Sequence, residues 1–215
     1  VQRLVALLSS NDVKTARAAA TACAKLSGHD GGRLALIQAG VGALCGLLGA
    51  KMQVVDTATL VAAARALANI SADSDGRHAL VNLEDPLSPF FTGMESQNVS
   101  IVRDCASSLA SLCTLRPGRL ALASAPAAGN LILGLLRQHE DLMLQTAAAR
   151  VVAGLVQEDD LLCWVRAKPQ LVESALSLLR SGERDLERCG SLLLWKLSAG
   201  PVADAGSGDW GVGRL

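Results

Sequence analysis

The apolar positions of the chain repeat at a long and nearly constant interval. A large aliphatic residue recurs with steps of 44, 42, 43 and 42 residues, at Leu26, Ile70, Leu112, Leu155 and Leu197. The residue three positions before each of these is also apolar, and the pair seven and six positions before is always small. These spacings fall on one face of a helix, where a small pair lets a neighbouring helix approach closely. The pattern predicts five long helices, over about residues 12–27, 54–71, 98–114, 141–157 and 184–198.

A second set of residues repeats in phase with the first. The string Gly-Arg-Leu-Ala-Leu at Gly32–Leu36 returns as Gly-Arg-His-Ala-Leu at Gly76–Leu80 and as Gly-Arg-Leu-Ala-Leu at Gly118–Leu122, with steps of 44 and 42 residues. Glycine or proline marks the corners between helical segments, as at Gly28 and Gly40. Each unit therefore has three helical segments, and neighbouring units must stack to bury their apolar faces.

The order of residues within a unit resembles the armadillo repeat family. A typical armadillo unit has an Arg and an aliphatic pair in a short first helix, a Gly or Pro corner, a second helix ending in Leu-Leu, and a long third helix closing on Ala-Leu-Ala-Asn-Leu-Ser. The matching segments here are Arg33–Gly40, Leu44–Leu48 and Ala66–Ser71. The resemblance covers about residues 1–199 and implies an all-α fold, a right-handed α-solenoid of armadillo-type three-helix repeats. HEAT repeats are the alternative fold, because their period lies in the same range.

The repeat phase divides the chain into a repeat domain and a tail. We expect an armadillo repeat domain over 1–199, with a partial repeat at 1–28, repeats at 29–72, 73–114, 115–157 and 158–199, and a flexible Gly-rich tail over 200–215. Because the chain starts at Val1 and within a unit, we expect it to be a piece of a longer protein.

Composition narrows the function classes. The 20 basic and 20 acidic residues balance, so no global charge points to nucleic acid, and no apolar stretch is long and uninterrupted enough to predict membrane insertion. Six cysteines are spaced unlike zinc ligands and are expected to be reduced and buried, which favours the cytoplasm or the nucleus. No phosphate-binding glycine loop, nucleophile elbow or metalloprotease motif occurs, so neither an enzyme, a metal nor a cofactor is predicted.

The resemblance implies that the third helices line a concave groove, which in some armadillo proteins holds an extended peptide. Of the asparagine ladder with which nuclear-import receptors bind their ligands, only Asn69 is present. Basic residues dominate the same predicted face. The predicted partner-binding residues are Lys14, Arg17, Lys25, Arg65, Asn69, Arg103, Arg150, Arg188 and Lys196.

These features predict a protein–protein interaction module that binds an extended segment, acidic or phosphorylated, through arginine. Two alternatives remain: the charges are simply solvated helix faces, or the repeats dock on other domains of the same larger protein. The recurring Arg33, Arg77 and Arg119 are predicted to be structural and to bond helix carbonyls or loop acids. The sequence leaves the identity of the partner and the oligomeric state open.

Overall fold

The computed structural model of the chain describes residues 1–50 and 55–199. Within these ranges every regular element is a helix, and there is no strand. The fold is an all-α solenoid, as predicted. The tail predicted over 200–215 lies outside the described residues.

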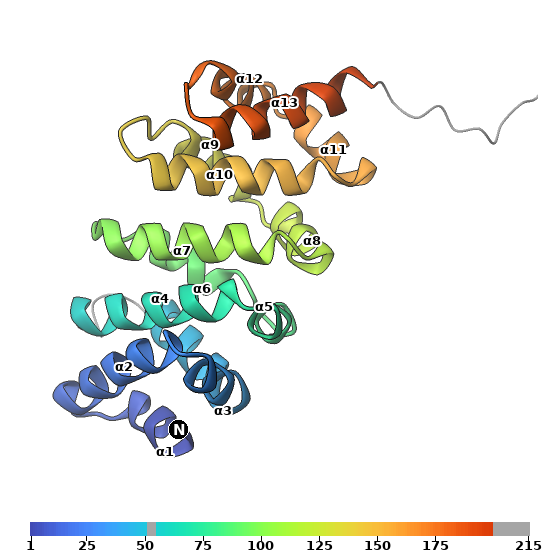
Figure 1. Ribbon diagram of the computed structural model, residues 1–215. Coiled ribbons are helices and arrows are strands. Elements are labelled where there is room, and N and C mark those ends of the chain that lie inside the picture. The colour runs from blue at the N-terminus through green and yellow to red at the C-terminus, as the bar shows by residue number, and fades with distance from the viewer. Residues whose placement is uncertain (51–54, 200–215) are drawn as a thin grey trace, which may run out of the picture.

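Five long third helices form the spine of the stack (Figure 1). Each packs against the next one along the chain, and they end within a few residues of the predicted limits. They are α2 (Val13–Ser27), α4 (Thr57–Ala72), α7 (Val99–Leu112), α10 (Leu142–Leu155) and α13 (Arg184–Ser198). Asp12, Asp56, Asn98 and Asp141 cap four of them by accepting hydrogen bonds from the first backbone N–H groups.

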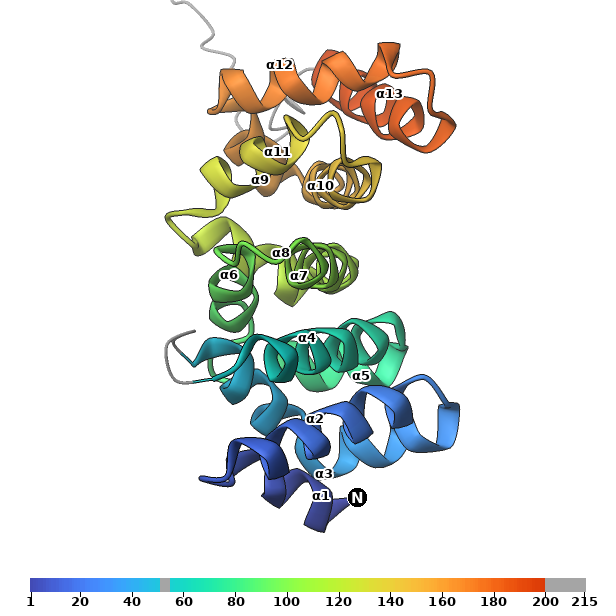
Figure 2. The ribbon, with the colours of Figure 1, turned by 90° about the vertical axis from the view of Figure 1, so that its left-hand side faces the viewer.

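Shorter helices complete the units. The first helices are α5 (Ser74–Val81), α8 (Arg116–Ser124) and α11 (Asp159–Arg166), and the second helices are α6 (Ser88–Met94), α9 (Ala128–Leu136) and α12 (Pro169–Ser177). The chain begins with α1 (Gln2–Ala6) and the 3-10 turn η1 (Leu7–Ser9), and a second 3-10 turn, η2 (Leu178–Arg180), follows α12. Figure 2 shows the third helices on one side of the stack and the second helices on the other.

The first and second helices of one unit run together as α3 (Asp30–Gly49), which is bent at Gly40, the predicted corner. By length and composition α3 could also cross a membrane, and the bent pair of α8 and α9 could do so as one broken span. In the stack, however, α3 packs against α2, α4 and α6, and its Leu36 and Leu44 are fully buried. A place in the core explains its buried positions, although only 28% of its most apolar 18-residue stretch is buried.

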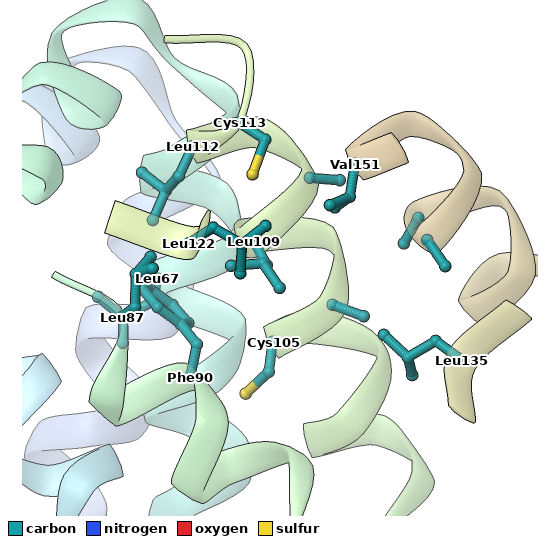
Figure 3. Packing of buried hydrophobic residues seen from close by; sticks show 14 of the residues in the cluster. Leu67, Leu87, Phe90, Cys105, Leu109, Leu112, Cys113, Leu122, Leu135 and Val151 are labelled. Atoms are coloured by element: carbon teal, nitrogen blue, oxygen red, sulfur yellow. The ribbon is translucent and has the colours of Figure 1, made fainter. Parts of the chain in front are cut away.

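Small and aliphatic residues build a core that runs continuously through the units. Figure 3 shows the part of this core that contains Leu67, Leu109 and Val151. Leu67 and Leu109, three positions before the closing aliphatic, are fully buried between consecutive units, and Phe90 is the largest fully buried side chain. Leu194, at the same position of α13, is 48% exposed because no described helix packs over it. Burial between units, rather than within one, therefore stabilises each long helix.

The sequence analysis expected all six cysteines to be reduced and buried; all six are free, but only four of them are buried. Cys163 is exposed on α11 and Cys189 is half-buried on α13. Burial raises the pKa of the thiols of Cys45, Cys105 and Cys113 to about 12, so these three remain protonated at neutral pH. Cys163 lies on the outward side of a short first helix, where the sequence has no pattern that distinguishes a covered position from an open one.

A recurring glycine sets the corner between units. A Cβ atom placed on Gly32, Gly76 or Gly118 would come closer than 3.0 Å to the backbone carbonyl of the closing aliphatic six residues earlier, for example that of Leu26 for Gly32. The repeating closing aliphatics and the repeating Gly-Arg strings therefore meet in space, because the glycine of each string packs against the backbone of the closing aliphatic before it.

Candidate functional site

The nine predicted binding residues all lie on the third helices. We call the surface that they mark the groove face. Seven of them have exposed side chains, whereas Asn69 and Lys196 are half-buried. Three of the arginines are paired with acids of the next unit, and two hollows lie near the ends of the face.

Three arginines of the groove face form ion pairs between consecutive third helices. Arg17 donates from Nε to Asp56 at 3.0 Å, and Arg65 donates from Nε to Asp104 at 2.8 Å. The third pair joins Nε of Arg103 to Asp141 at 2.8 Å.

The position of the arginine alternates from unit to unit. It stands nine residues before the closing aliphatic in Arg17 and Arg103, and five residues before it in Arg65. The partner changes accordingly, from the N-cap of the next third helix to Asp104 within the helix. The sequence analysis named these arginines as partner-binding residues and assigned them no acidic partners within the chain. A separation of 38 or 39 residues, one helical turn short of the repeat, is the signal that would have paired them.

Two of the partner acids serve a helix cap and an ion pair together. Burial acts to raise the pKa of Asp56, but hydrogen bonds from the side chain and backbone of Thr59, together with Arg17, hold that pKa below its usual value. Burial likewise opposes the shift at Asp141, whose pKa is lowered by Arg103 and by the N–H groups of the first turn. Both carboxylates are therefore ionised at neutral pH. Since the arginines are about half exposed, each pair contributes only roughly 0.2–1 kcal/mol to stability.

A hollow of about 380 Å³ lies over α2. Lys14, Arg17 and Lys25 line it, and Ala18, Thr21 and Ala22 form its remaining wall. Arg17 forms an ion pair with Asp56, whereas Lys14 and Lys25 make no ion pair with any residue of 1–50 or 55–199. This end of the groove face therefore carries two free ammonium groups beside small side chains.

A second hollow, of about 560 Å³, lies between α10 and α13. We call it the C-terminal hollow. It contains Arg150 and Arg188, neither of which forms an ion pair with a described residue. Its lining consists of Thr146, Arg150, Ala153, Asp185, Arg188, Cys189 and Leu192. The sequence analysis missed Thr146, Ala153, Cys189 and Leu192, because a groove wall of small and apolar residues has the same pattern as a packed helix face.

The other two predicted residues are engaged with their neighbours. The amide nitrogen of Asn69 donates to Oγ of Ser27 in the preceding unit at 3.0 Å. Lys196 places its amino group 5.4 Å from the centre of the Trp195 ring, and that ring is 61% exposed. Neither side chain lies against the two hollows.

The arginines of the Gly-Arg strings are structural, as predicted. Nη1 of Arg77 donates to the carbonyl oxygens of Ser71 and Ala72, and Nη1 of Arg119 donates to those of Cys113 and Thr114. Each thereby satisfies carbonyl groups at the end of a third helix, which have no partner within the helix.

An acid of the next unit completes the contact at two of these arginines. Arg33 lies 3.5 Å from Asp73, and Arg119 pairs with Glu158. Arg77 has no such acid, because Leu115 occupies the position that Asp73 and Glu158 hold in the other units. The buried Nε atoms of both Arg77 and Arg119 have no partner. Among the described residues no group of three His, Cys, Asp or Glu side chains could hold a metal ion.

The comparisons with known proteins concern the fold. No model of a known protein family matches the sequence, and no curated protein matches it. Among solved structures, a designed armadillo repeat protein superposes with a TM-score of 0.77 at 17% identity, over 93% of this chain and 82% of its own. The chain has an armadillo-type repeat fold.

Two further structures agree with this assignment. A designed armadillo repeat protein in complex with the peptide (KR)4 gives a TM-score of 0.76 at 16% identity, over 92% of this chain and 81% of the other. An engineered protein gives 0.74 at 23% identity, over 92% and 81% of the two chains. At these identities the likeness concerns the armadillo-type backbone and not the residues of the groove face.

Proposed function

We propose that this armadillo-type chain is a protein-binding scaffold, not an enzyme, and that its groove face holds an extended acidic segment of a partner. The observation that carries the proposal is the distribution of charge. In a chain of net charge zero, cations without an ion-pair partner among the described residues lie in both hollows of one face.

The internal ion pairs support a division of the face into two kinds of position. In the middle, Arg65 and Arg103 are neutralised by acids of the next unit. Near the ends, Lys14, Lys25, Arg150 and Arg188 are left to a ligand. An extended segment that places acidic groups near both ends would complement this pattern, and its electrostatic attraction would also speed association.

The structural neighbours make a peptide ligand reasonable for this fold. One of them was solved with (KR)4, a peptide of alternating lysine and arginine. The charge on the groove face of this chain is opposite to what such a peptide needs, which favours an acidic peptide here. Reduced cysteines throughout the described ranges support a site of action in the cytoplasm or the nucleus.

A charge-reversal experiment tests the proposal. The probe is an extended synthetic peptide of alternating Glu and Ala, compared with one of alternating Lys and Ala, in fluorescence anisotropy at low and physiological salt. The triple variant Lys14→Glu, Lys25→Glu, Arg150→Glu should lose binding of the Glu peptide. The matched control, with the same change of net charge on exposed residues of the other helices, is Arg3→Glu, Arg137→Glu, Arg180→Glu.

The control variant should bind the Glu peptide as the unmodified chain does. If both variants lose binding of the Glu peptide equally, the effect comes from net charge and not from the groove face. If the groove-face variant binds the Glu peptide as the unmodified chain does, the proposal is wrong. The alternative function, docking on other domains of a larger protein through the exposed Val1 and Leu7 near the N-terminus, would leave the groove face bare. It predicts that neither peptide binds.

A further inference from the structure

The C-terminal hollow is the place where the series of ion pairs stops. Arg150 stands five residues before its closing aliphatic, like Arg65. The partner of Arg65 is Asp104, but the equivalent residue on α13, eight before Leu197, is Cys189. Among the five third helices only α7 carries an acid at this position; the others carry Ala18, Ala62, Ala147 and Cys189.

Arg188 also makes no ion pair with any residue of 1–50 or 55–199. It stands nine residues before Leu197, as Arg17 and Arg103 stand before theirs, and those two bond the N-cap acid of the next third helix. Two arginines that would each have a carboxylate elsewhere in the stack thus line one hollow.

The residues around the two arginines do not replace the missing acids. Burial, with the charge of Asp185 beside it, raises the pKa of the Cys189 thiol, although Arg150 and Arg188 act in the opposite direction. The thiol is therefore uncharged at neutral pH. Asp185 lies on the wall of the hollow but makes no ion pair with either arginine, and in the first turn of α13 it faces the positive end of the helix dipole.

We infer that the C-terminal hollow binds a phosphoryl group carried by a side chain of the partner segment, with Arg150 and Arg188 as its ligands. A phosphoryl group carries close to two negative charges at neutral pH and three acceptor oxygens, so it can take hydrogen bonds from two guanidinium groups at once. One carboxylate can also accept from two arginines, as Glu158 does from Arg116 and Arg119, but its single negative charge balances only one of them, whereas a phosphoryl group balances both. Thr146 adds a hydroxyl to the wall, and Ala153 with Leu192 provides an apolar surface for the carrying side chain.

This inference rests on the proposed function, but phosphoserine alone can test it first. Phosphoserine is titrated into the chain while the arginine Nε–H signals are followed by NMR. The signals of Arg150 and Arg188 should shift and saturate, whereas those of Arg65 and Arg103 should not move, since their Nε–H groups already bond to aspartate. Similar shifts at all four arginines, or none at Arg150 and Arg188, would overturn the inference.

Substitution of Cys189 gives a matched pair of variants. Cys189→Asp restores the acid found at Asp104, so it should pair with Arg150 and weaken phosphoserine binding about tenfold or more, the range expected for a lost charge-assisted hydrogen bond. Cys189→Ser introduces no charge and should leave binding unchanged. If Cys189→Asp fails to fold, Arg150→Gln takes its place with the same expected loss. If Cys189→Asp binds phosphoserine as tightly as the unmodified chain does, the inference is wrong.

The peptide arms separate this inference from the proposed function. Three versions of the Glu–Ala peptide carry Ser, Glu or phosphoserine near one end, and each is made with that residue near the amino end and near the carboxyl end. Tighter binding of the phosphorylated version alone, lost in Cys189→Asp, supports both ideas. Equal binding of the three peptides, abolished by the groove-face triple variant, keeps the scaffold function and refutes the phosphoryl site. Phosphoserine shifts at Arg150 and Arg188 without binding of any peptide keep the site and refute the scaffold function.

Discussion

The glycine at the corner between units allows a comparison of two adjacent residues. Gly31 and Gly32 both lie in the first turn of α3. A Cβ atom on Gly32 would press against the backbone of Leu26, at the end of α2, while a Cβ atom on Gly31 meets no atom within 4 Å. The same substitution, Gly→Ala, is therefore expected to lower stability at Gly32 and to maintain or raise it at Gly31.

The structure sets the expected magnitudes. At Gly32 the obstacle is main chain held at a helix end, so α3 must move away from α2, and overpacking of this kind costs about 1–3 kcal/mol. At Gly31 the added methyl group only reduces the freedom of the unfolded chain and favours the helix, which stabilises by up to about 1 kcal/mol. For a chain of this length each kcal/mol changes the melting temperature by roughly 2–4 °C.

Urea and thermal unfolding followed by far-ultraviolet circular dichroism measure the difference. Gly32→Ala should unfold at a lower midpoint than the unmodified chain, and Gly31→Ala at an equal or higher one. Gly118→Ala repeats the test at another corner, where the added Cβ would press on Leu112. If Gly32→Ala is as stable as the unmodified chain, or if Gly31→Ala loses as much as Gly32→Ala, the close backbone contact is not what selects glycine.

Three further outcomes follow from the charges and thiols. Leu115→Asp should stabilise the chain by about 1 kcal/mol, because an aspartate there caps α8 and gives Arg77 the acid that it lacks. Urea unfolding measures the change, with Leu115→Asn as the uncharged control. A loss of stability in Leu115→Asp would contradict the structural role given to Arg77. The folded-state pKa values of Asp56 and Asp141 lie below the unfolded value near 3.8, so their contribution to stability is complete above that pH and is lost as the pH falls below it. In that acid range the urea unfolding midpoint of the Asp56→Asn and Asp141→Asn variants should decline less steeply with falling pH than that of the unmodified chain. Equal slopes would show that these two carboxylates are not the cause of the decline. In native chain a thiol reagent followed by mass spectrometry should modify Cys163 first and the buried thiols only after unfolding, and uniform labelling would refute the packing.

The repeat architecture could be predicted from the sequence because each unit presents the same physical problem. A helix that buries one face against two neighbours needs apolar residues at fixed intervals, and the closing aliphatics, from Leu26 onward, record those intervals directly. The corner at Gly40 could be predicted equally well, since corners between helical segments accept few residue types.

The charge pattern of the groove face could be predicted only in part. The sequence identifies which cations share a face, but whether each one is free depends on an acid one repeat away, as for Arg65 and Asp104. The C-terminal hollow was not predicted, because Cys189 stands where α7 has Asp104 and, taken alone, resembles any other small core residue. Such a position becomes visible only when equivalent units are compared in space.

The glycine corner described above also bears on how such proteins diversify. At three corners one contact between consecutive units is made by main-chain atoms and the hydrogen of a glycine, so this contact imposes no demand on the outward side chains of the long helices. Substitutions of outward residues that make no ion pair between units can therefore change what the surface recognises without disturbing this contact.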